Sequence, residues 1–313
     1  MSLQTNSPRT LFQSAAWYPE VRDEETIRED IELMLELGLN AVRVGEFAWS
    51  SMEPEEGQYR FDWWRGILDR LHEAGIRVIL GTPTVTPPIW LTRKHPEIGF
   101  ISRNGQYHGH GGRNHACYSN DAYRTACEGI AGAMAEALGG HPALHAWQID
   151  NEFRGHQRMC VCPVCTHKWR LWLQERYGDI EQLNRAWFLD LWSERYDAFT
   201  DFPAPVPTGS GTHNHSHEHA YRIFMSDMVL EFCQLQQRAI RRHSDAPITH
   251  NNLGLVDPHK LFGMLDFACW DMYCSQEEFY RTQFDHDWCR PICPRPFWVM
   301  ETDPEFGHPK GFL

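Results

Sequence analysis

The stretch that decides the fold is "DEETIREDIELMLELGLNAVRV", from Asp23 to Val44. Its first part carries apolar residues at helical spacing behind Asp23, a residue type that caps the start of helices. Gly38 is placed to end this helix, and the β-branched run up to Val44 predicts a short buried strand. The same order returns in the next unit, where Gly75 precedes "IRVIL". A repeated helix–strand unit of this kind is typical of a parallel sheet covered by helices.

Five further runs are predicted to be strands, which makes seven with the two just described. They are "LFQSAA", "LHAWQI", "PITHN", "DFACWDMY" and "PFWVM". Helices are expected over residues 122–138, 166–177 and 222–243, and Asp179 with Gln182 has the spacing of a capping box. No glycine-rich phosphate loop follows these strands, so the units favour a (β/α)8 TIM barrel over a doubly wound sheet.

Composition limits the possible functions. The chain has 313 residues, 42% of them hydrophobic, so residues 1–313 are expected to form one barrel domain. The net charge of −13 argues against a nucleic-acid partner. Neither a signal peptide nor a membrane-spanning run is visible, so a cytoplasmic location and no membrane partner are expected. The ten cysteines are then expected to be reduced thiols or metal ligands rather than a disulfide framework.

Active-site residues of TIM barrels lie just after the strand ends, and several polar residues of this chain have that position. They are Glu46, Asp150, Asn151, Glu152, Asn251, Asn252, Asp271 and Glu301. Glu152 and Glu301 follow the fourth and seventh predicted strands, which face each other across the mouth of a barrel. Two facing carboxylates can act as general acid and nucleophile on a glycosidic bond. The alternative is that one or both are partners in structural ion pairs.

A series of motifs runs in a constant order along nearly the whole chain. They are "RVGEFAWSSMEPEEGQYRFDWW", "TPTVTPPIWL", "HACYSNDAYR", "WQIDNEF", "NRAWFLDLWSERY", "ITHNNLG", "DFACWDMY" and "FWVMETDP". Together they resemble glycoside hydrolase family 42, the β-galactosidases. The resemblance implies a retaining hydrolase of terminal β-D-galactosides that forms a covalent galactosyl-enzyme intermediate, with Glu152 as acid/base and Glu301 as nucleophile. It also implies a homotrimer, and no organic cofactor is expected.

The resemblance assigns four substrate-binding residues as well. Asn151 would hydrogen-bond the sugar 2-hydroxyl, a contact that strengthens in the oxocarbenium-like transition state. Arg113 matches an arginine near the galactose, and Tyr273 matches a sixth-strand tyrosine beside the nucleophile. Trp192 would border the pocket. For Arg113 the alternative is a structural ion pair, and for Trp192 it is core packing.

Three cysteines follow the predicted acid/base residue with the spacing C-x-C-x-x-C: Cys160, Cys162 and Cys165. One further thiolate would complete a tetrahedral site for a structural zinc ion. The resemblance supplies Cys117 as the fourth ligand. Four thiolates leave no open position, so the metal would tie two loops together rather than take part in catalysis. The alternative is a set of reduced thiols without metal.

A second metal-like tract is "HNHSHEH", from His213 to His219, whose histidines at alternate positions could bind a divalent ion. The tract follows the proline- and glycine-rich run "FPAPVPTGSGT". It is therefore predicted to be an exposed loop that leads into a helix at Tyr221, rather than a metal site.

The chain departs from the family pattern in two places. Arg154 stands where the family usually has glycine, in the turn after the acid/base, and could reshape the subsite that holds the leaving group. The sequence ends at Leu313, soon after Glu301, so the eighth strand is expected to be missing and the domain incomplete. The alternatives are an inactive truncated barrel with a carbohydrate-binding or assembly role, a related barrel hydrolase acting on another β-glycoside, and a zinc-dependent binding module.

Overall fold

The computed structural model describes residues 11–156, 159–209, 211, 214–252, 254–273, 279–292 and 297–302. One parallel sheet has the strand order β1 (Ser14–Ala16), β2 (Ala41–Val44), β3 (Arg77–Gly81), β6 (Leu144–Gln148) and β7 (Ile248–Thr249). A second parallel sheet consists of β8 (Asn251–Asn252), β9 (Cys269–Met272) and β10 (Trp298–Thr302). A hairpin of β4 (Phe100–Ile101) and β5 (Tyr107–His108) stands apart. The spatial order of the parallel strands follows the chain, as in the successive βα units of a TIM barrel.

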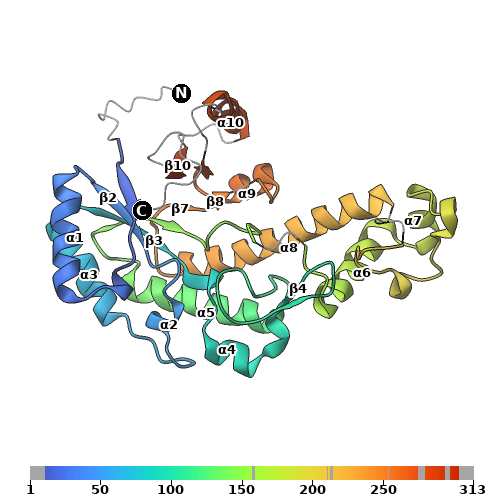
Figure 1. The fold of residues 1–313 in the computed structure, drawn as a ribbon, viewed down its shortest axis with the longest axis horizontal. Coiled ribbons are helices and arrows are strands. Elements are labelled where there is room, and N and C mark those ends of the chain that lie inside the picture. Colours follow the sequence, from blue (N-terminus) through green and yellow to red (C-terminus); the bar gives the residue numbers. More distant parts are fainter. Residues whose placement is uncertain are drawn as a thin grey trace.

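Helices connect and flank these strands (Figure 1). They are α1 (Glu24–Glu36), α2 (Trp49–Met52), α3 (Asp62–Glu73), α4 (Ile89–Lys94), α5 (Asp121–Leu138), α6 (Pro163–Tyr177), α7 (Ile180–Ala186), α8 (His215–Arg241), α9 (Pro258–Met264) and α10 (Phe279–Ile292). Short 3-10 helices are η1 (Pro19–Val21), η2 (Pro83–Val85), η3 (Pro96–Ile98), η4 (Leu191–Ser193) and η5 (Phe199–Asp201). Helices α5 and α8 pack side by side, and α8 runs on to an extension that carries α6 and α7 (Figure 1). In the described part of the chain, no helix combines the length and apolar character needed to cross a bilayer.

The predicted helix–glycine–strand unit is present at the start of the sheet. The Asp23 carboxylate accepts a hydrogen bond from the Thr26 amide at 2.8 Å and so caps α1. Gly38 has a φ of 73°, a left-handed conformation that glycine adopts without strain at the end of a helix. All four residues of β2 are buried, as expected for a strand covered on both faces.

The predicted strand "PITHN" is divided into β7 and β8 by His250. Its buried ring lies between the Ile149 carbonyl oxygen, 2.8 Å from Nδ1, and the Phe153 amide, which donates to Nε2 at 3.2 Å. Burial lowers the pKa of His250 to about 3, so the ring is neutral, with Nδ1 donating and Nε2 accepting. His250, at the break between the two sheets, therefore anchors the turn that follows β6.

The two ends of the strand arc approach each other. No hydrogen-bonded pairing joins β1 to β10 among the described residues, but the ring of Phe12, just before β1, lies 5.4 Å from that of Trp298 in β10. Arg43 in β2 pairs with Glu301 in β10 at 2.7 Å. The chain after Thr302 lies outside the described residues, so the expected absence of an eighth strand and the single incomplete domain stay predictions.

Buried apolar side chains form two clusters. The first fills the barrel and reaches the C-terminal half of α8. The second, which we call the peripheral cluster, consists of Phe100, Cys117, Met159, Cys160, Cys162, Cys165, Trp169, Leu173, Leu183, Trp187, Leu189, Phe202, Ala204, Ala220, Tyr221, Phe224, Met225 and Met228. Trp169 lies within it, with its ring centroid 5.0 Å from that of Tyr221. Aromatic packing of this kind stabilises the extension.

The prediction of an exposed loop for the histidine tract is wrong for residues 215–219, which are helical. Helix α8 begins at His215, because the Asn214 side chain accepts a hydrogen bond from the Ser216 amide at 2.8 Å and caps it. His217 is 2% exposed, stacks on Trp169 and lies 3.0 Å from the Pro203 carbonyl oxygen through Nε2. This side chain is a packing residue, and His213 lies outside the described residues.

Candidate active site

The site is built around the turn that follows β6. Asp150, Glu152 and Arg154 all have positive φ, at 56°, 48° and 65°. Residues other than glycine seldom adopt this conformation, which costs on the order of 1–3 kcal/mol each. Asp150 is fully buried while Glu152 is partly exposed, so the turn directs the first carboxylate into the core and leaves the second accessible.

Hydrogen bonds within the turn and from η2 and β8 hold this strained turn. The Asp150 carboxylate accepts from Thr84 Oγ1 at 2.5 Å and from the Asn151 amide at 2.7 Å. Burial raises the pKa of Asp150 to about 7. The Glu152 amide donates to Asn251 Oδ1 at 3.1 Å. The position of Glu152 is thus set by buried partners on both sides of β6.

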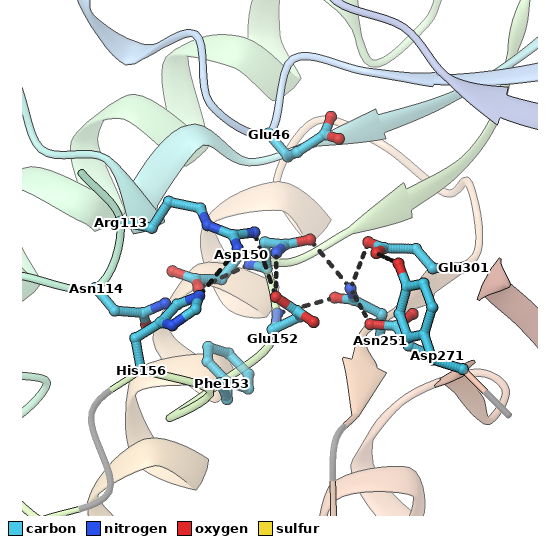
Figure 2. Close-up of polar contacts among 12 residues, drawn as sticks. Glu46, Arg113, Asn114, Asp150, Glu152, Phe153, His156, Asn251, Asp271 and Glu301 are labelled. Atoms are coloured by element: carbon cyan, nitrogen blue, oxygen red, sulfur yellow. Dashed lines mark hydrogen bonds and ion pairs between the residues drawn. The ribbon is translucent and has the colours of Figure 1, made fainter. Parts of the chain in front are cut away.

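The Glu152 carboxylate lies between a cation and an amide (Figure 2). Arg113 Nη1 and Asn151 Nδ2 each donate to its Oε2 at 3.3 Å. Arg113 also donates to His156 Nε2 at 2.9 Å, and its guanidinium lies 5.4 Å from the ring centroid of Phe47. One side of Glu152 is therefore positively charged and open enough to receive a ligand, since the Arg113 side chain is 39% exposed.

Glu301, in β10, receives three donors. Arg43 Nη1 lies at 2.7 Å, the Tyr273 hydroxyl donates at 2.5 Å, and Asn251 Nδ2 donates at 3.2 Å. Burial lowers the pKa of Arg43, but the charges of Glu46 and Glu301 outweigh this and raise it. Glu301 consequently lies against a permanent positive charge.

The carboxyl groups of Glu152, Asp271 and Glu301 converge, with one oxygen of each within 4.8 Å of the others. Retaining glycosidases bring two carboxyl groups to about 5–5.5 Å, whereas inverting enzymes leave about 6.5–9.5 Å for a water molecule. The observed separation fits direct attack by one carboxylate. Burial, and then the charge of Glu301, raise the pKa of Asp271 to about 8, so this third carboxyl keeps its proton near neutral pH.

Asn251 links the members of the site (Figure 2). Its Nδ2 lies 3.0 Å from Asn151 Oδ1, 2.9 Å from Asp271 Oδ2 and 3.2 Å from Glu301 Oε1. The strand-end rule pointed to Asn251 and Asp271 without giving them a role. Arg43 was missed, and its only signal was a charged residue inside the apolar run "AVRV".

The structure brings five of the six predicted catalytic and substrate-binding residues together. They are Arg113, Asn151, Glu152, Tyr273 and Glu301. Trp192 is not among them. It follows α7, which lies at the far end of the extension (Figure 1), and its side chain is 79% exposed. Its place beside the pocket stays a prediction.

The four predicted metal-binding cysteines also lie together, within the peripheral cluster. Their Sγ atoms are all within 4.8 Å of one another, and all four side chains are buried. Cys117 Sγ is 3.3 Å from Cys165 Sγ and 3.6 Å from Cys162 Sγ. Thiolates about 2.3 Å from a tetrahedral zinc ion lie about 3.8 Å from each other, so the set fits such an ion. Cys162 Sγ accepts from the Cys165 amide at the start of α6, which favours a thiolate.

Comparison with known proteins gives the same picture. The family model for beta-galactosidase (glycoside hydrolase family 42) matches residues 16–308. Beta-galactosidase YesZ of Bacillus subtilis (strain 168) is 44% identical over 302 residues, which cover 96% of this chain and 45% of that protein. The structure of beta-galactosidase from the psychrophilic Marinomonas ef1 is 34% identical with a TM-score of 0.87, over 94% of this chain and 48% of that one. The cold-adapted enzyme of Rahnella sp. R3 is 33% identical with a TM-score of 0.89, over 96% and 47%.

Parallel strands in chain order, with carboxylates that converge at the strand ends, are the TIM-barrel arrangement of the glycoside hydrolase class. The chain belongs to the β-galactosidases of glycoside hydrolase family 42. The predicted family and fold class are therefore confirmed. The chain spans about half the length of the curated relatives that it matches.

Proposed function

We propose that this chain carries the catalytic centre of a retaining β-galactosidase, which removes terminal non-reducing β-D-galactose from its substrates. The observation that carries the proposal is the approach of Glu152 and Glu301 to within 4.8 Å. This distance leaves no room for an inverting water between the carboxylates. The β-galactosidase names of the relatives support the choice of sugar.

In the first half of the reaction, Glu301 attacks the anomeric carbon as the bond to the glycosidic oxygen breaks. The electron pair of that bond goes to the oxygen, which takes a proton from Glu152 and leaves as the free alcohol. Arg43 and Tyr273 orient the attacking carboxylate of Glu301. Asn151, beside the acid, is placed to hydrogen-bond the 2-hydroxyl of the sugar.

In the second half, water enters where the alcohol has left. Glu152, now a carboxylate, takes a proton from the water, whose oxygen attacks the anomeric carbon and releases Glu301. Two displacements at one carbon retain its configuration. Arg113, which donates to Glu152 at 3.3 Å, stabilises the carboxylate between the two steps.

Hydrolysis of p-nitrophenyl β-D-galactoside by the 313-residue chain tests this proposal. Glu301→Gln is expected to abolish turnover, because no nucleophile remains. Glu152→Gln is expected to release one burst of nitrophenolate and then stall, since this leaving group needs little protonation but the second step needs a base. If the wild-type chain folds but does not hydrolyse the substrate, the proposal is contradicted and the alternative of an inactive truncated barrel is favoured.

We also propose that Cys117, Cys160, Cys162 and Cys165 hold a structural zinc ion. When bound, the ion would join the loop that carries Arg113 to the start of α6 and would add no reactive position. Metal analysis of the purified chain tests this, with about one zinc per chain expected. A metal-free chain with unchanged stability would contradict it.

A homotrimer is proposed on the resemblance alone, and sedimentation of the purified chain tests it. The cytoplasmic location and the lack of a nucleic-acid partner stay predictions.

A further inference from the structure

A cavity of about 1190 Å³ opens next to the turn that carries Glu152. Its wall includes Arg154 and His156 of that turn, together with parts of the β4–β5 hairpin, of α8 and of the segment before α9. His156 contacts Arg113, which contacts Glu152 (Figure 2). The cavity therefore shares a wall with the acid/base side of the site, and its size suits a ligand of several sugar units.

The cations that line this cavity outnumber its carboxylates, in a chain whose net charge is −13. Its ionised lining residues are Arg103, Arg154, Arg222, Lys260, Asp227 and Asp257. Lys260 neutralises Asp227 at 2.7 Å, and Asp257 caps α9 by accepting from the His259 amide at 3.0 Å. Arg103 is paired with Glu218. Arg154 and Arg222 are two further cations of the lining, and Asp257 is its remaining carboxylate.

Arg222 projects from the exposed side of α8, and among the described residues it has no hydrogen-bond or ion-pair partner. Arg154 is 4% exposed and donates to the Leu255 carbonyl oxygen at 2.7 Å. Burial, together with the charge of Arg222, lowers the pKa of Arg154 to about 10. The two guanidinium groups therefore repel each other, and a bound anion would relieve that repulsion.

The backbone at Arg154 gives an independent reason to assign it a role. Its φ of 65° is a left-handed conformation that glycine adopts without strain. A buried arginine in this conformation carries backbone strain and a desolvation cost that glycine would avoid. Strain of this kind accumulates at functional sites.

We propose that the cavity binds the leaving group of galactosides whose aglycone carries a carboxylate, and that Arg154 and Arg222 bind this carboxylate. The proposal rests on the proposed function, because Glu152 protonates the leaving oxygen on this side of the site. A guanidinium group matches a carboxylate with two parallel hydrogen bonds. A neutral aglycone gains no such contact, so the chain discriminates by the charge of the aglycone.

Lactobionate and lactitol form a matched pair of probes. Both carry galactose in the same β-1,4 linkage to an open-chain six-carbon aglycone, and they differ only by a carboxylate in place of a hydroxymethyl group. The ratio of kcat/KM for the two sugars, measured by galactose release, is expected to favour lactobionate about tenfold in the wild-type chain. Arg222→Gln is expected to reduce this ratio about fivefold, and high salt is expected to reduce it as well. Arg238→Gln, on the exposed side of α8 and outside the cavity, serves as the matched control.

Calorimetric titration of both sugars into Glu301→Gln separates this proposal from the proposed function, because binding needs no turnover. If lactobionate binds more tightly than lactitol, this difference depends on Arg222, and the wild-type chain hydrolyses neither sugar, then the anion site is supported and the proposed hydrolase activity is rejected. If the wild-type chain hydrolyses both sugars with equal kcat/KM, the proposed anion site is wrong and the proposed hydrolase activity is supported. Equal effects of Arg222→Gln and Arg238→Gln also overturn the anion site, as does equal binding of the two sugars.

Discussion

Arg43 and Glu301 form an ion pair at 2.7 Å that joins β2 to β10 across the barrel mouth. The same guanidinium holds Glu46 at 2.9 Å and Gln148, in β6, at 3.3 Å. One buried cation thereby binds side chains from both sheets. The position of the proposed nucleophile depends on this cation as much as on its own strand.

Removal of this cation should therefore be costly. Arg43→Gln is expected to lower the free energy of unfolding by about 3–5 kcal/mol, because buried carboxylates lose their partner. Urea unfolding followed by tryptophan fluorescence measures the loss. Arg28→Gln is the control, since it removes a surface pair with Glu25 at 3.8 Å whose contribution is at most about 1 kcal/mol. Equal losses in the two variants would show that the Arg43 pair is no stronger than a surface pair.

Asp271→Asn is expected to flatten the dependence of stability on pH. Burial and the charge of Glu301 raise the pKa of Asp271 to about 8 in the folded chain, against about 3.9 in an unfolded one. The folded state thus keeps a proton that the unfolded state releases. The stabilisation from this group is fully present below about pH 4 and is lost as the pH rises through about 8.

Urea unfolding between about pH 5 and about pH 8 measures this effect. The wild-type slope from Asp271 alone is at most about 1.4 kcal/mol per pH unit. Asp150, whose pKa is raised to about 7, leaves part of the slope in the Asn variant. Identical slopes in both chains would show that Asp271 titrates normally.

The amide of Asn251 should matter for turnover more than for binding. Asn251→Ala removes the donor shared by Asn151, Asp271 and Glu301, so the carboxylates lose their relative orientation. A misplacement of about 1 Å can cost about a hundredfold in rate, so kcat on p-nitrophenyl β-D-galactoside is expected to fall by that order while KM changes less. Asn252→Ala, at the next position of β8, is the control. A fall in kcat no larger than that of the control counts against this role.

Removal of metal is expected to destabilise the extension. Cys162→Ser should lower the zinc content and shift the apparent Tm down by more than about 5 °C, and a chelator should do the same to the wild-type chain. Cys127→Ser, a buried thiol of the barrel cluster outside the cysteine site, should keep its zinc. Loss of zinc without a change in Tm would mean that the metal does not hold the loops.

Much of the barrel follows from local signals in the sequence. Asp23 and Gly38 mark the ends of α1, and the run "AVRV", which is apolar except at Arg43, is buried at all four positions, as predicted. The strand-end rule of this fold predicted that Glu152 and Glu301 face each other, and in the structure one carboxyl oxygen of each lies within 4.8 Å of the other. Their catalytic roles stay predictions.

What the sequence hid are contacts that depend on tertiary structure. Nothing local to Arg43 shows that its partner lies far along the chain in β10. The proline- and glycine-rich run before the histidine tract suggested a loop, but packing of His217 against Trp169 favours helix from His215 onward. The motif assigns Trp192 a place beside the pocket, but this exposed side chain follows α7 in the extension, so its role stays a prediction.

Helix α8 has 27 residues, so it spans about 40 Å as one rod. Its first half, up to Met228, belongs to the peripheral cluster, and its second half, from Val229, belongs to the barrel cluster. One continuous helix therefore joins the extension, which contains the four-cysteine site, to the barrel. A displacement of the extension is expected to move the barrel end of α8 as well. Amide hydrogen exchange along α8 should change abruptly near this boundary if the extension opens on its own, and uniformly if the two cores melt as one body.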